Sequence, residues 1–243
     1  MCLAIWKPAG KFLPVEHIKA GFSANPHGAG FAFSKGGKIT IRKGFFNVDH
    51  LIEAWTTEVG SLPAMLHFRW ATHGKRGEFN CHPWELCNGR FAMIHNGILP
   101  IQSTEDKSDT GHFADLVLSP SIEKHGHPSD PVLKYLIESA IGGGNKIVVM
   151  DEKGHATIYQ EKAGQWEDGI WYSNDGFRPQ PDYASRFSDF GNDEWELPRS
   201  NKKRAGFVCL ECESDIDEQQ DEQIDEYEWL CRECFLREMN DTR

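Results

Sequence analysis

The chain has 243 residues, of which 39% are hydrophobic and 26% are charged, and its formal net charge is −11. This length accommodates one large domain with a proper hydrophobic core, or such a domain plus a small module. We find no apolar run of the roughly 20 residues needed to cross a bilayer, and no signal-peptide pattern at the N-terminus. These features exclude membrane-spanning and secreted proteins, and they predict a cytoplasmic location.

The negative charge is concentrated near the C-terminus. Residues 209–243 contain thirteen Asp and Glu against three Lys and Arg, so the preceding 208 residues are close to neutral. An acidic segment is repelled by nucleic-acid phosphates, and the short basic run 202–204 is too small to reverse this. We therefore expect no nucleic-acid partner.

The hydrophobic pattern predicts alternating strands and helices. We expect a strand over 2–6, a hairpin of strands 31–33 and 38–42 around Gly36-Gly37, and a helix from Asp49, its cap, to Val59. Apolar runs predict further strands over 64–68, 91–94, 146–150, 156–160 and 170–173. Helices are expected over 111–118 and from Pro131, capped by Asp130, to the glycines 142–144. The buried stripe of this last helix is predicted to be Val132, Leu133, Leu136, Ile137 and Ala140. This order indicates an α+β domain whose sheets are covered by helices.

The second residue is a cysteine that directly follows the initiator methionine. Methionine aminopeptidase normally removes Met1 ahead of so small a side chain, which would leave Cys2 with a free α-amine. A thiol and an amine of reference pKa about 7.7–8.0 would then share one residue, as in an N-terminal nucleophile that carries its own base. Many chains have a second-position cysteine without a function, so this hypothesis depends on the rest of the sequence.

Four polar segments follow Cys2, and two of them begin where a predicted strand ends. Their ranges are 69–74 (Arg-Trp-Ala-Thr-His-Gly), 80–83 (Asn-Cys-His-Pro), 95–98 (His-Asn-Gly-Ile) and 108–110 (Ser-Asp-Thr). Loops at strand ends are where a rigid sheet presents reactive groups. In this order and with Cys2, the segments resemble the class II glutamine amidotransferase domain over roughly residues 2–175. The stretch 27–32 is similar to the family's glycine-containing stretch before its second strand.

The resemblance implies a four-layer αββα fold of the N-terminal nucleophile hydrolases and an enzyme that releases ammonia from glutamine. Cys2 would attack the side-chain amide, and the Asn96 side chain and Gly97 backbone N–H would form the oxyanion hole. Arg69 would bind the α-carboxylate of glutamine, and Asp109 its α-ammonium. The other substrate-binding residues that the resemblance implies are Trp70, Thr72 and His73.

Taken alone, each of these residues also fits a structural role. Arg69 fits a surface ion pair, Trp70 fits packing, and Asn96-Gly97 fits a simple turn. The side chains expected to be buried and structural are those of His73, His95, Cys81 and Cys87. If all these residues were only structural, the occurrence of the segments in this order would require several coincidences. The sequence therefore favours the amidotransferase.

Two features depart from the family pattern. Gly111 follows Asp109-Thr110 where the family often has an acidic residue. The chain also has no synthase segment to receive ammonia, and in this it resembles the stand-alone amidotransferase-like proteins of bacteria and their phages. We therefore expect the ammonia acceptor on a separate protein partner. The alternatives are a hydrolase of γ-glutamyl amides and a non-catalytic regulatory protein that retains the pocket.

Two C-x-x-C pairs near the C-terminus predict a structural zinc site. Cys209 and Cys212 are separated by eighteen residues from Cys231 and Cys234. Four thiolates satisfy tetrahedral Zn²⁺ and leave no open position, and a module of this size needs the metal to fold. An unmetallated or redox-active pair is the alternative. The sequence thus predicts an amidotransferase-like domain over 1–175, an irregular wrap or linker over 176–205, and a zinc finger over 206–243.

Overall fold

The computed structural model describes residues 2–70, 77–104 and 106–179, with the short segments 222–223 and 229–230. The chain divides into two units, Met1–Gln180 and Pro181–Arg243, each of which is described by itself. In the second unit, Glu222–Gln223 (β11) pairs antiparallel with Trp229–Leu230 (β12). The predicted domain boundaries remain predictions, because most of 176–243 lies outside the described ranges.

The larger sheet of the first unit is antiparallel and has the strand order β3-β2-β4-β1-β10-β9. Its strands are Leu3–Lys7 (β1), Ala29–Lys35 (β2), Lys38–Phe45 (β3), Ala64–Phe68 (β4), Gln165–Glu167 (β9) and Ile170–Tyr172 (β10). β1 lies between two neighbours, with Leu3 opposite Phe68 and Ile5 opposite Tyr172. The start of the chain is therefore fixed in the interior of the sheet.

The smaller sheet is also antiparallel, and its strand order is β5-β6-β7-β8. Its strands are Trp84–Leu86 (β5), Phe91–Asn96 (β6), Lys146–Asp151 (β7) and Ala156–Tyr159 (β8). β6 is longer than the predicted strand, because His95 and Asn96 still pair with Ile147 and Lys146. The turn therefore begins at Gly97. The sequence prediction also missed β5 and β9, each only three residues long.

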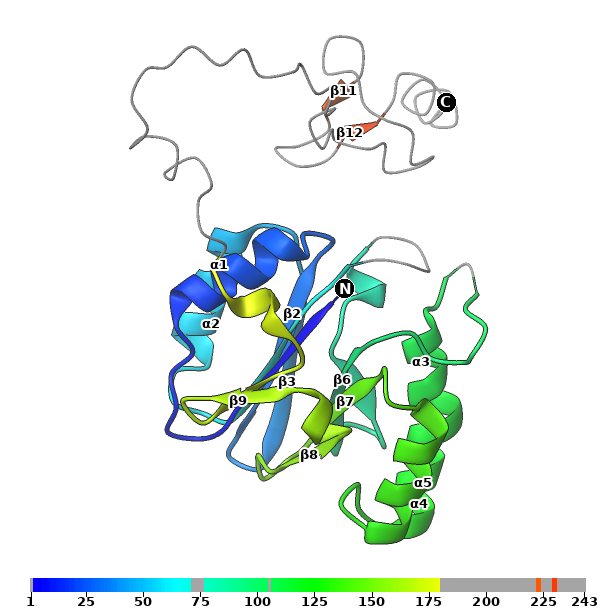
Figure 1. The fold of residues 1–243 in the computed structure, drawn as a ribbon. Coiled ribbons are helices and arrows are strands. Elements are labelled where there is room, and N and C mark those ends of the chain that lie inside the picture. Colours follow the sequence, from blue (N-terminus) through cyan, green and yellow to red (C-terminus); the bar gives the residue numbers. More distant parts are fainter. Residues whose placement is uncertain (1, 71–76, 105, 180–221, 224–228, 231–243) are drawn as a thin grey trace, which may run out of the picture. The chain divides into compact units, whose positions relative to one another are not determined.

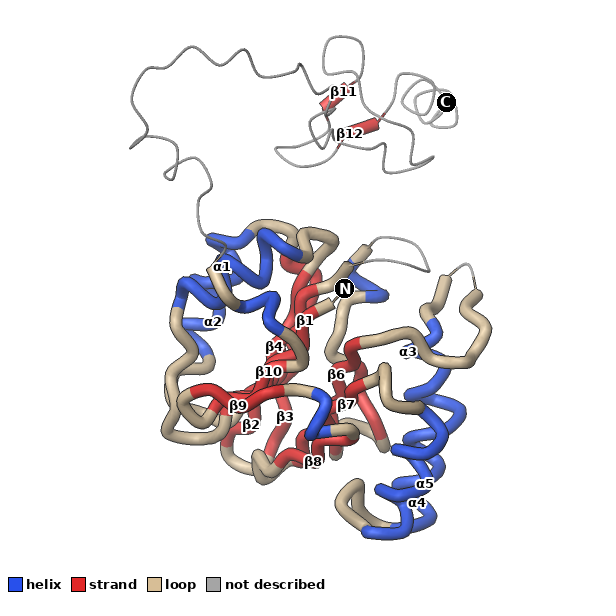
Figure 2. Tube along the Cα trace, viewed as in Figure 1, coloured by secondary structure: helices blue, strands red, loops and turns tan. Residues whose placement is uncertain are grey.

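Helices cover the outer face of each sheet, as Figures 1 and 2 show. Their bounds are Val15–Ala24 (α1), Val48–Glu58 (α2), Asp109–Phe113 (α3), Ser119–His125 (α4) and Pro131–Ile141 (α5). α1 and α2 pack on the larger sheet, and α3 to α5 pack on the smaller one. This arrangement confirms the predicted α+β class with sheets covered by helices, and the structure shows in addition that both sheets are antiparallel.

Three apolar layers hold the first unit together. Along β1, Leu3 and Ile5 face α1 and α2, whereas Ala4 and Trp6 face the smaller sheet. The third layer lies between the smaller sheet and α3 to α5. A strand that is buried on both faces has no alternation of polar and apolar residues, which is why its run is continuously apolar. The layers in order are helix, sheet, sheet and helix.

The helices around the candidate site differ from their predicted bounds. The helix predicted over 111–118 begins two residues earlier, where the Ser108 side chain accepts the Gly111 N–H at its N-cap. A π-helical turn over Ala114–Leu118 joins it to α4. Asp109 therefore lies in the first turn of a helix, not in the loop before it.

The outer helices bring three further corrections. α1 was not predicted, and the cap of α2 is Asn47, which accepts the Asp49 and His50 N–H groups, and not Asp49 itself. The cap of α5 is confirmed, because Asp130 accepts the Leu133 N–H. Its buried residues are Leu133, Ile137 and Ile141, whereas the predicted Val132, Leu136 and Ala140 are exposed.

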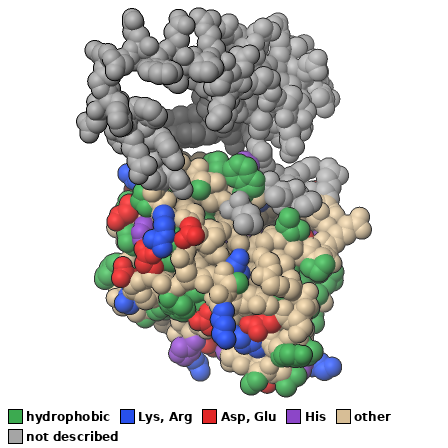
Figure 3. Space-filling model, in the orientation of Figure 1, with side chains coloured by type: hydrophobic (Ala, Val, Ile, Leu, Met, Phe, Trp, Pro, Cys, Tyr) green, Lys and Arg blue, Asp and Glu red, His purple; other side chains and the backbone are tan. Residues whose placement is uncertain are grey.

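On the face that Figure 3 draws, the described residues form no large patch of side chains with charge of one sign. There, basic, acidic and hydrophobic side chains of the first unit are interspersed. Among the residues that the structure describes, no helix is both long enough and apolar enough to cross a bilayer.

Candidate active site

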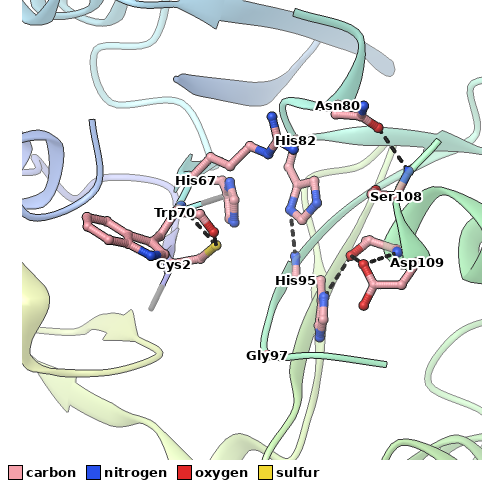
Figure 4. A pocket seen from close by; sticks show the side chains of 11 residues that line it. Cys2, His67, Trp70, Asn80, His82, His95, Gly97, Ser108 and Asp109 are labelled. Carbon is pink, nitrogen blue, oxygen red and sulfur yellow. Dashed lines mark hydrogen bonds between the residues drawn. The ribbon is translucent and has the colours of Figure 1, made fainter. Parts of the chain in front are cut away.

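One pocket of the first unit gathers residues from the ends of both sheets (Figure 4). Cys2 directly precedes β1, Arg69 directly follows β4, and Gly97 directly follows β6. The lining residues are Cys2, His67, Arg69, Trp70, Asn80, His82, His95, Gly97, Ser108, Asp109 and Thr110. The pocket thus brings together five of the site residues predicted from sequence: Cys2, Arg69, Trp70, Gly97 and Asp109. Thr72 and His73 lie outside the described residues.

The thiol of Cys2 is held by the backbone of Trp70. The Trp70 N–H donates to Sγ at 3.2 Å, and the thiol lies 3.5 Å from the Trp70 carbonyl oxygen. Burial raises the pKa of the Cys2 thiol, and the Trp70 backbone and the Arg69 charge only partly oppose this. The thiol is therefore neutral near pH 7, and a nucleophilic attack by it requires a base.

Asn96 does not line the pocket, although the sequence predicts it as an oxyanion donor. It is buried at the end of β6, and its side-chain amide donates to the backbone carbonyl of Cys2. The other side-chain atom, Oδ1, has no hydrogen-bond partner among the described residues. The Asn96 amide thus lies beside the nucleophile and binds it through the backbone carbonyl of Cys2.

Arg69 is 5% exposed, and its backbone is tied to the stretch before β2. The Arg69 N–H donates to the Gly28 carbonyl at 2.8 Å, and the His27 N–H donates to the Arg69 carbonyl at 3.1 Å. Gly28 has φ of +109°, and a Cβ atom there would lie 2.6 Å from Cys81 Sγ. A glycine is therefore required at residue 28. This requirement gives a physical reason for the glycine in the stretch 27–32.

Asp109 fixes the turn that follows β6. Its Oδ2 accepts the Leu99 N–H at 2.8 Å, and its Oδ1 accepts the Thr110 N–H at 2.8 Å. Each carboxylate oxygen retains acceptor capacity for a ligand ammonium group. Asp109 can therefore position the Gly97 turn and bind a cationic group at the same time.

Gly97 is required by its contact with Asn145. Its φ is +139°, and a Cβ atom there would lie 2.2 Å from Asn145 Oδ1 and 3.0 Å from Asn145 Cα. Asn145 cannot simply turn away, since its Oδ1 lies 2.9 Å from His95 Nε2 and its Nδ2 donates to the Ile141 carbonyl at 2.7 Å. The backbone N–H of residue 97 is therefore held in one place.

Three buried histidines line the same pocket as Cys2. The rings of His67 and His82 have centroids 4.0 Å apart, and those of His82 and His95 are 6.3 Å apart. The His95 N–H donates to His82 Nδ1 at 3.3 Å, and the His95 ring bonds to Thr110 and Asn145. Burial lowers the pKa of all three, that of His67 to about 3. All three rings are therefore neutral at physiological pH.

The sequence prediction of a satisfied structural His95 is confirmed, but His67 was missed. A histidine inside the apolar run 64–68 was the available signal, since a lone polar residue in a buried strand requires a reason. The predicted burial of Cys81 and Cys87 is confirmed, whereas Trp70 is 43% exposed and packs against the His27 ring at 4.8 Å. Trp70 is therefore a wall of the pocket and not part of the core.

No metal site is formed by the described part of the chain. Within those ranges, no group of three or more His, Cys, Asp or Glu side chains is placed to hold an ion. The four predicted zinc ligands, Cys209, Cys212, Cys231 and Cys234, lie outside the described residues. The zinc finger remains a prediction from sequence.

The chain is similar to glutamine–fructose-6-phosphate aminotransferases (isomerizing). The Bacillus licheniformis protein is 27% identical over 143 residues, which are 55% of this chain and 24% of that protein. The Pyrococcus horikoshii protein is 39% identical over 72 residues, 29% of this chain and 12% of that protein. The chain therefore spans about a quarter or less of the length of these relatives.

Among solved structures, the glutamine phosphoribosylpyrophosphate amidotransferase of B. subtilis matches 70% of this chain and 40% of its own, with 20% identity and a TM-score of 0.45. No family model matches the chain. The sequence similarity to the aminotransferases supports the resemblance to class II glutamine amidotransferases.

Proposed function

We propose that the first unit hydrolyses the side-chain amide of glutamine, with Cys2 as the nucleophile, and supplies ammonia to an acceptor on a separate protein. The observation that carries this proposal is the one pocket that Cys2, Arg69 and Asp109 line together. A cation and an anion on the wall around one thiol match the α-carboxylate and α-ammonium of an amino acid. The similarity to enzymes named for glutamine supports the choice of amino acid.

The proposed chemistry begins once Met1 has been removed. The α-amine of Cys2 takes the thiol proton, and sulfur attacks the amide carbon of glutamine. The negative charge that forms on the carbonyl oxygen is stabilised by the Gly97 N–H and by the second amide hydrogen of Asn96. The proton returns to the amide nitrogen, which leaves as ammonia, and a thioester remains on Cys2.

Water then resolves the thioester. It adds to the carbonyl carbon, its proton goes to the α-amine, and the carbon–sulfur bond breaks to give glutamate and the regenerated thiol. Arg69 and Asp109 bind the amino-acid end throughout, and Thr72 and His73 complete the cradle in this proposal. Trp70 covers the thiol side of the bound substrate.

The test is release of glutamate from glutamine by protein whose N-terminal Cys2 is verified by intact mass. We expect Cys2→Ala to lower the rate by at least about a thousandfold, because the nucleophile is lost. Cys87→Ala removes a buried cysteine that lies outside the pocket and is the control for the loss of a thiol. Equal rates for wild type and Cys2→Ala would refute the nucleophile, and retained Met1 in an active protein would refute the α-amine as base.

For the C-terminal region, we propose a structural Zn²⁺ held by Cys209, Cys212, Cys231 and Cys234, in a module that docks the acceptor protein. The carrying observation is the spacing of the two C-x-x-C pairs. Metal analysis of freshly purified protein is expected to give one zinc per chain, and Cys209→Ser with Cys231→Ser to lose it. Wild-type protein without zinc would overturn the metal site.

A further inference from the structure

The backbone carbonyl of Cys2 receives two side-chain amides. Asn174 Nδ2 donates to it at 2.8 Å, and Asn96 Nδ2 donates to the same oxygen. Asn96 is the last residue of β6 in the smaller sheet, and Asn174 follows β10 of the larger sheet by two residues. A donor from each sheet therefore binds this one carbonyl group. The two side chains, Asn96 and Asn174, are together called the clamp.

The clamp lies where regular pairing of β1 stops. The ladder between β1 and β4 begins with Leu3 opposite Phe68. On the other side, the Ser173 N–H donates to the Ala4 carbonyl at 2.9 Å, and the Ala4 N–H donates to Ser173 Oγ at 2.9 Å. Cys2 precedes these ladders, so its backbone is fixed by side chains and not by strand pairing.

Asn174 is itself held in one orientation. Its Oδ1 accepts the Gly176 N–H at 2.9 Å and caps the 3₁₀ turn Asp175–Phe177. Phe177 anchors this turn, since its ring stacks on Tyr172 with centroids 3.7 Å apart. The opposite amide orientation would set Oδ1 against the Cys2 carbonyl oxygen and remove the cap. The capping bond therefore directs the amide donor at Cys2.

We propose that Asn174 is a positioning residue for the Cys2 nucleophile and acts with Asn96 through the Cys2 carbonyl. This inference rests on the proposed function of Cys2. Reaction requires the sulfur and the attacked carbon to lie about 3–3.5 Å apart, and a displacement of 1 Å can cost about a hundredfold in rate. Without the Asn174 donor, the backbone of residue 2 turns more freely and the thiol occupies the attacking position less often.

The chain offers variants that separate positioning from stability. Asn174→Asp keeps the acceptor that caps Gly176 but replaces the donor, whereas Asn174→Ala removes both. Asn47→Ala is the matched control, because Asn47 caps α2 by accepting the Asp49 and His50 N–H groups and lies outside the pocket. Each protein is checked for Met1 removal by intact mass and for folding by thermal melting.

We expect kcat for glutamate release to fall about ten- to hundredfold in both Asn174 variants. KM is expected to stay within about twofold, because Arg69 and Asp109 are unchanged. The rate at which iodoacetamide alkylates Cys2 without substrate, read by mass spectrometry, is expected to fall in parallel. Asn47→Ala is expected to lower the melting temperature and leave kcat and alkylation unchanged.

Three results would overturn the assignment of Asn174. These are kcat and alkylation within twofold of wild type in both Asn174 variants, an equal loss of kcat in Asn47→Ala, or a loss confined to KM. Failure of the proposed function gives a different pattern. In that case wild-type protein releases no more glutamate than Cys2→Ala, while the alkylation rates still report whether Asn174 positions the thiol.

Discussion

The two walls of the pocket are held in place by different kinds of interaction. On the wall of the larger sheet, the hydrogen bonds come from backbone atoms. The Trp70 N–H donates to the Cys2 thiol, and the backbone of Arg69 exchanges hydrogen bonds with residues 27 and 28. On the wall of the smaller sheet, side chains bind one another, from the Asp109 carboxylate and the Thr110 hydroxyl through the His95 ring to Asn145.

This difference separates residues that supply reactive groups from residues that hold the shape of the pocket. A side chain on a wall held by backbone bonds can be replaced while the chain path stays the same, so substitutions there change the chemistry that is available. On a wall built from linked side chains, one substitution leaves buried donors and acceptors unpaired and moves its neighbours. Substitutions on the smaller-sheet wall are therefore expected to change both stability and rate.

The largest effect is expected for Gly97→Ala on the side-chain wall. The new Cβ would meet Asn145 Oδ1 and Cα, so the backbone must shift and the residue 97 N–H moves away from its position. We expect kcat to fall by on the order of 10²–10³, the typical cost of losing one oxyanion donor. Steady-state glutamate release measures this effect.

The control for this variant is Gly142→Ala. Gly142 also has a positive φ, +71°, but a Cβ atom there has no neighbour within 4 Å. It therefore carries the same type of backbone strain without the collision. A similar loss of kcat in both variants would show that strain, and not displacement of the residue 97 N–H, is responsible.

Arg69→Met tests the backbone-held wall and is expected to have the next largest effect. The main-chain bonds of residue 69 are unchanged by the substitution, so the fold is retained while the cation is lost. We expect KM for glutamine to rise about a hundredfold, the lower part of the range for removing one partner of a buried charge pair. Arg69→Lys is expected to recover only part of this, because lysine cannot form the bidentate contact.

Arg42→Met is the control for the loss of an arginine. Arg42 pairs with Glu58 at 3.1 Å on the exposed side of β3, where an ion pair contributes little. Its KM is expected to equal that of wild type. An unchanged KM in Arg69→Met would remove this residue from the substrate site.

The sequence predicted the part of the site that depends on motif order, and missed the part that depends on long-range contact. Cys2, Arg69, Gly97 and Asp109 stand in recognisable segments, and all four line the pocket. Asn174 contacts Cys2 across 172 positions of sequence, and no local pattern around it indicates that partner. Such a contact is produced by the sheet order, which places β10 beside β1.

The fold shows the same division between local and long-range information. The Gly36-Gly37 hairpin and the Asp130 cap of α5 are local signals, and both were predicted correctly. The buried face of α5 was partly wrong, because its many apolar residues allow more than one stripe, and packing selects Leu133, Ile137 and Ile141. In α1, only Ile18 and Gly21 are buried, which leaves little periodic signal to detect.

A smaller, graded effect is expected from acidification of the histidines that link the two walls. The folded pKa of His67 is about 3, against an ordinary value of 6.5, so below 6.5 the unfolded chain binds a proton that the folded protein excludes. Stability therefore falls as the pH decreases from about 6.5 toward 3. The contribution of one such histidine is at most about 1.4 kcal/mol per pH unit.

Urea unfolding at several pH values between 4 and 7 measures this contribution. His67→Leu is expected to show a shallower loss of unfolding free energy with acidification than wild type. His50→Leu, at an exposed position of α2, is expected to keep the wild-type slope. An unchanged slope in His67→Leu would mean that His67 is not kept neutral by the fold.

The smallest effect is expected at Gly111, where the chain departs from the class II pattern. A Cβ atom there would lie 2.8 Å from the Trp84 ring and 2.8 Å from Lys107 Cε, so these side chains occupy the room that a larger residue would need. In Gly111→Ala, the gain in helix propensity of about 1 kcal/mol is opposed by an overpacking cost of about 1–3 kcal/mol. We expect a net loss near 1 kcal/mol in urea unfolding, with unchanged kcat and KM. In a Trp84→Leu background the collision is absent, so the same substitution is expected to be neutral or stabilising. An equal loss in both backgrounds would show that Trp84 is not the reason for glycine at this position.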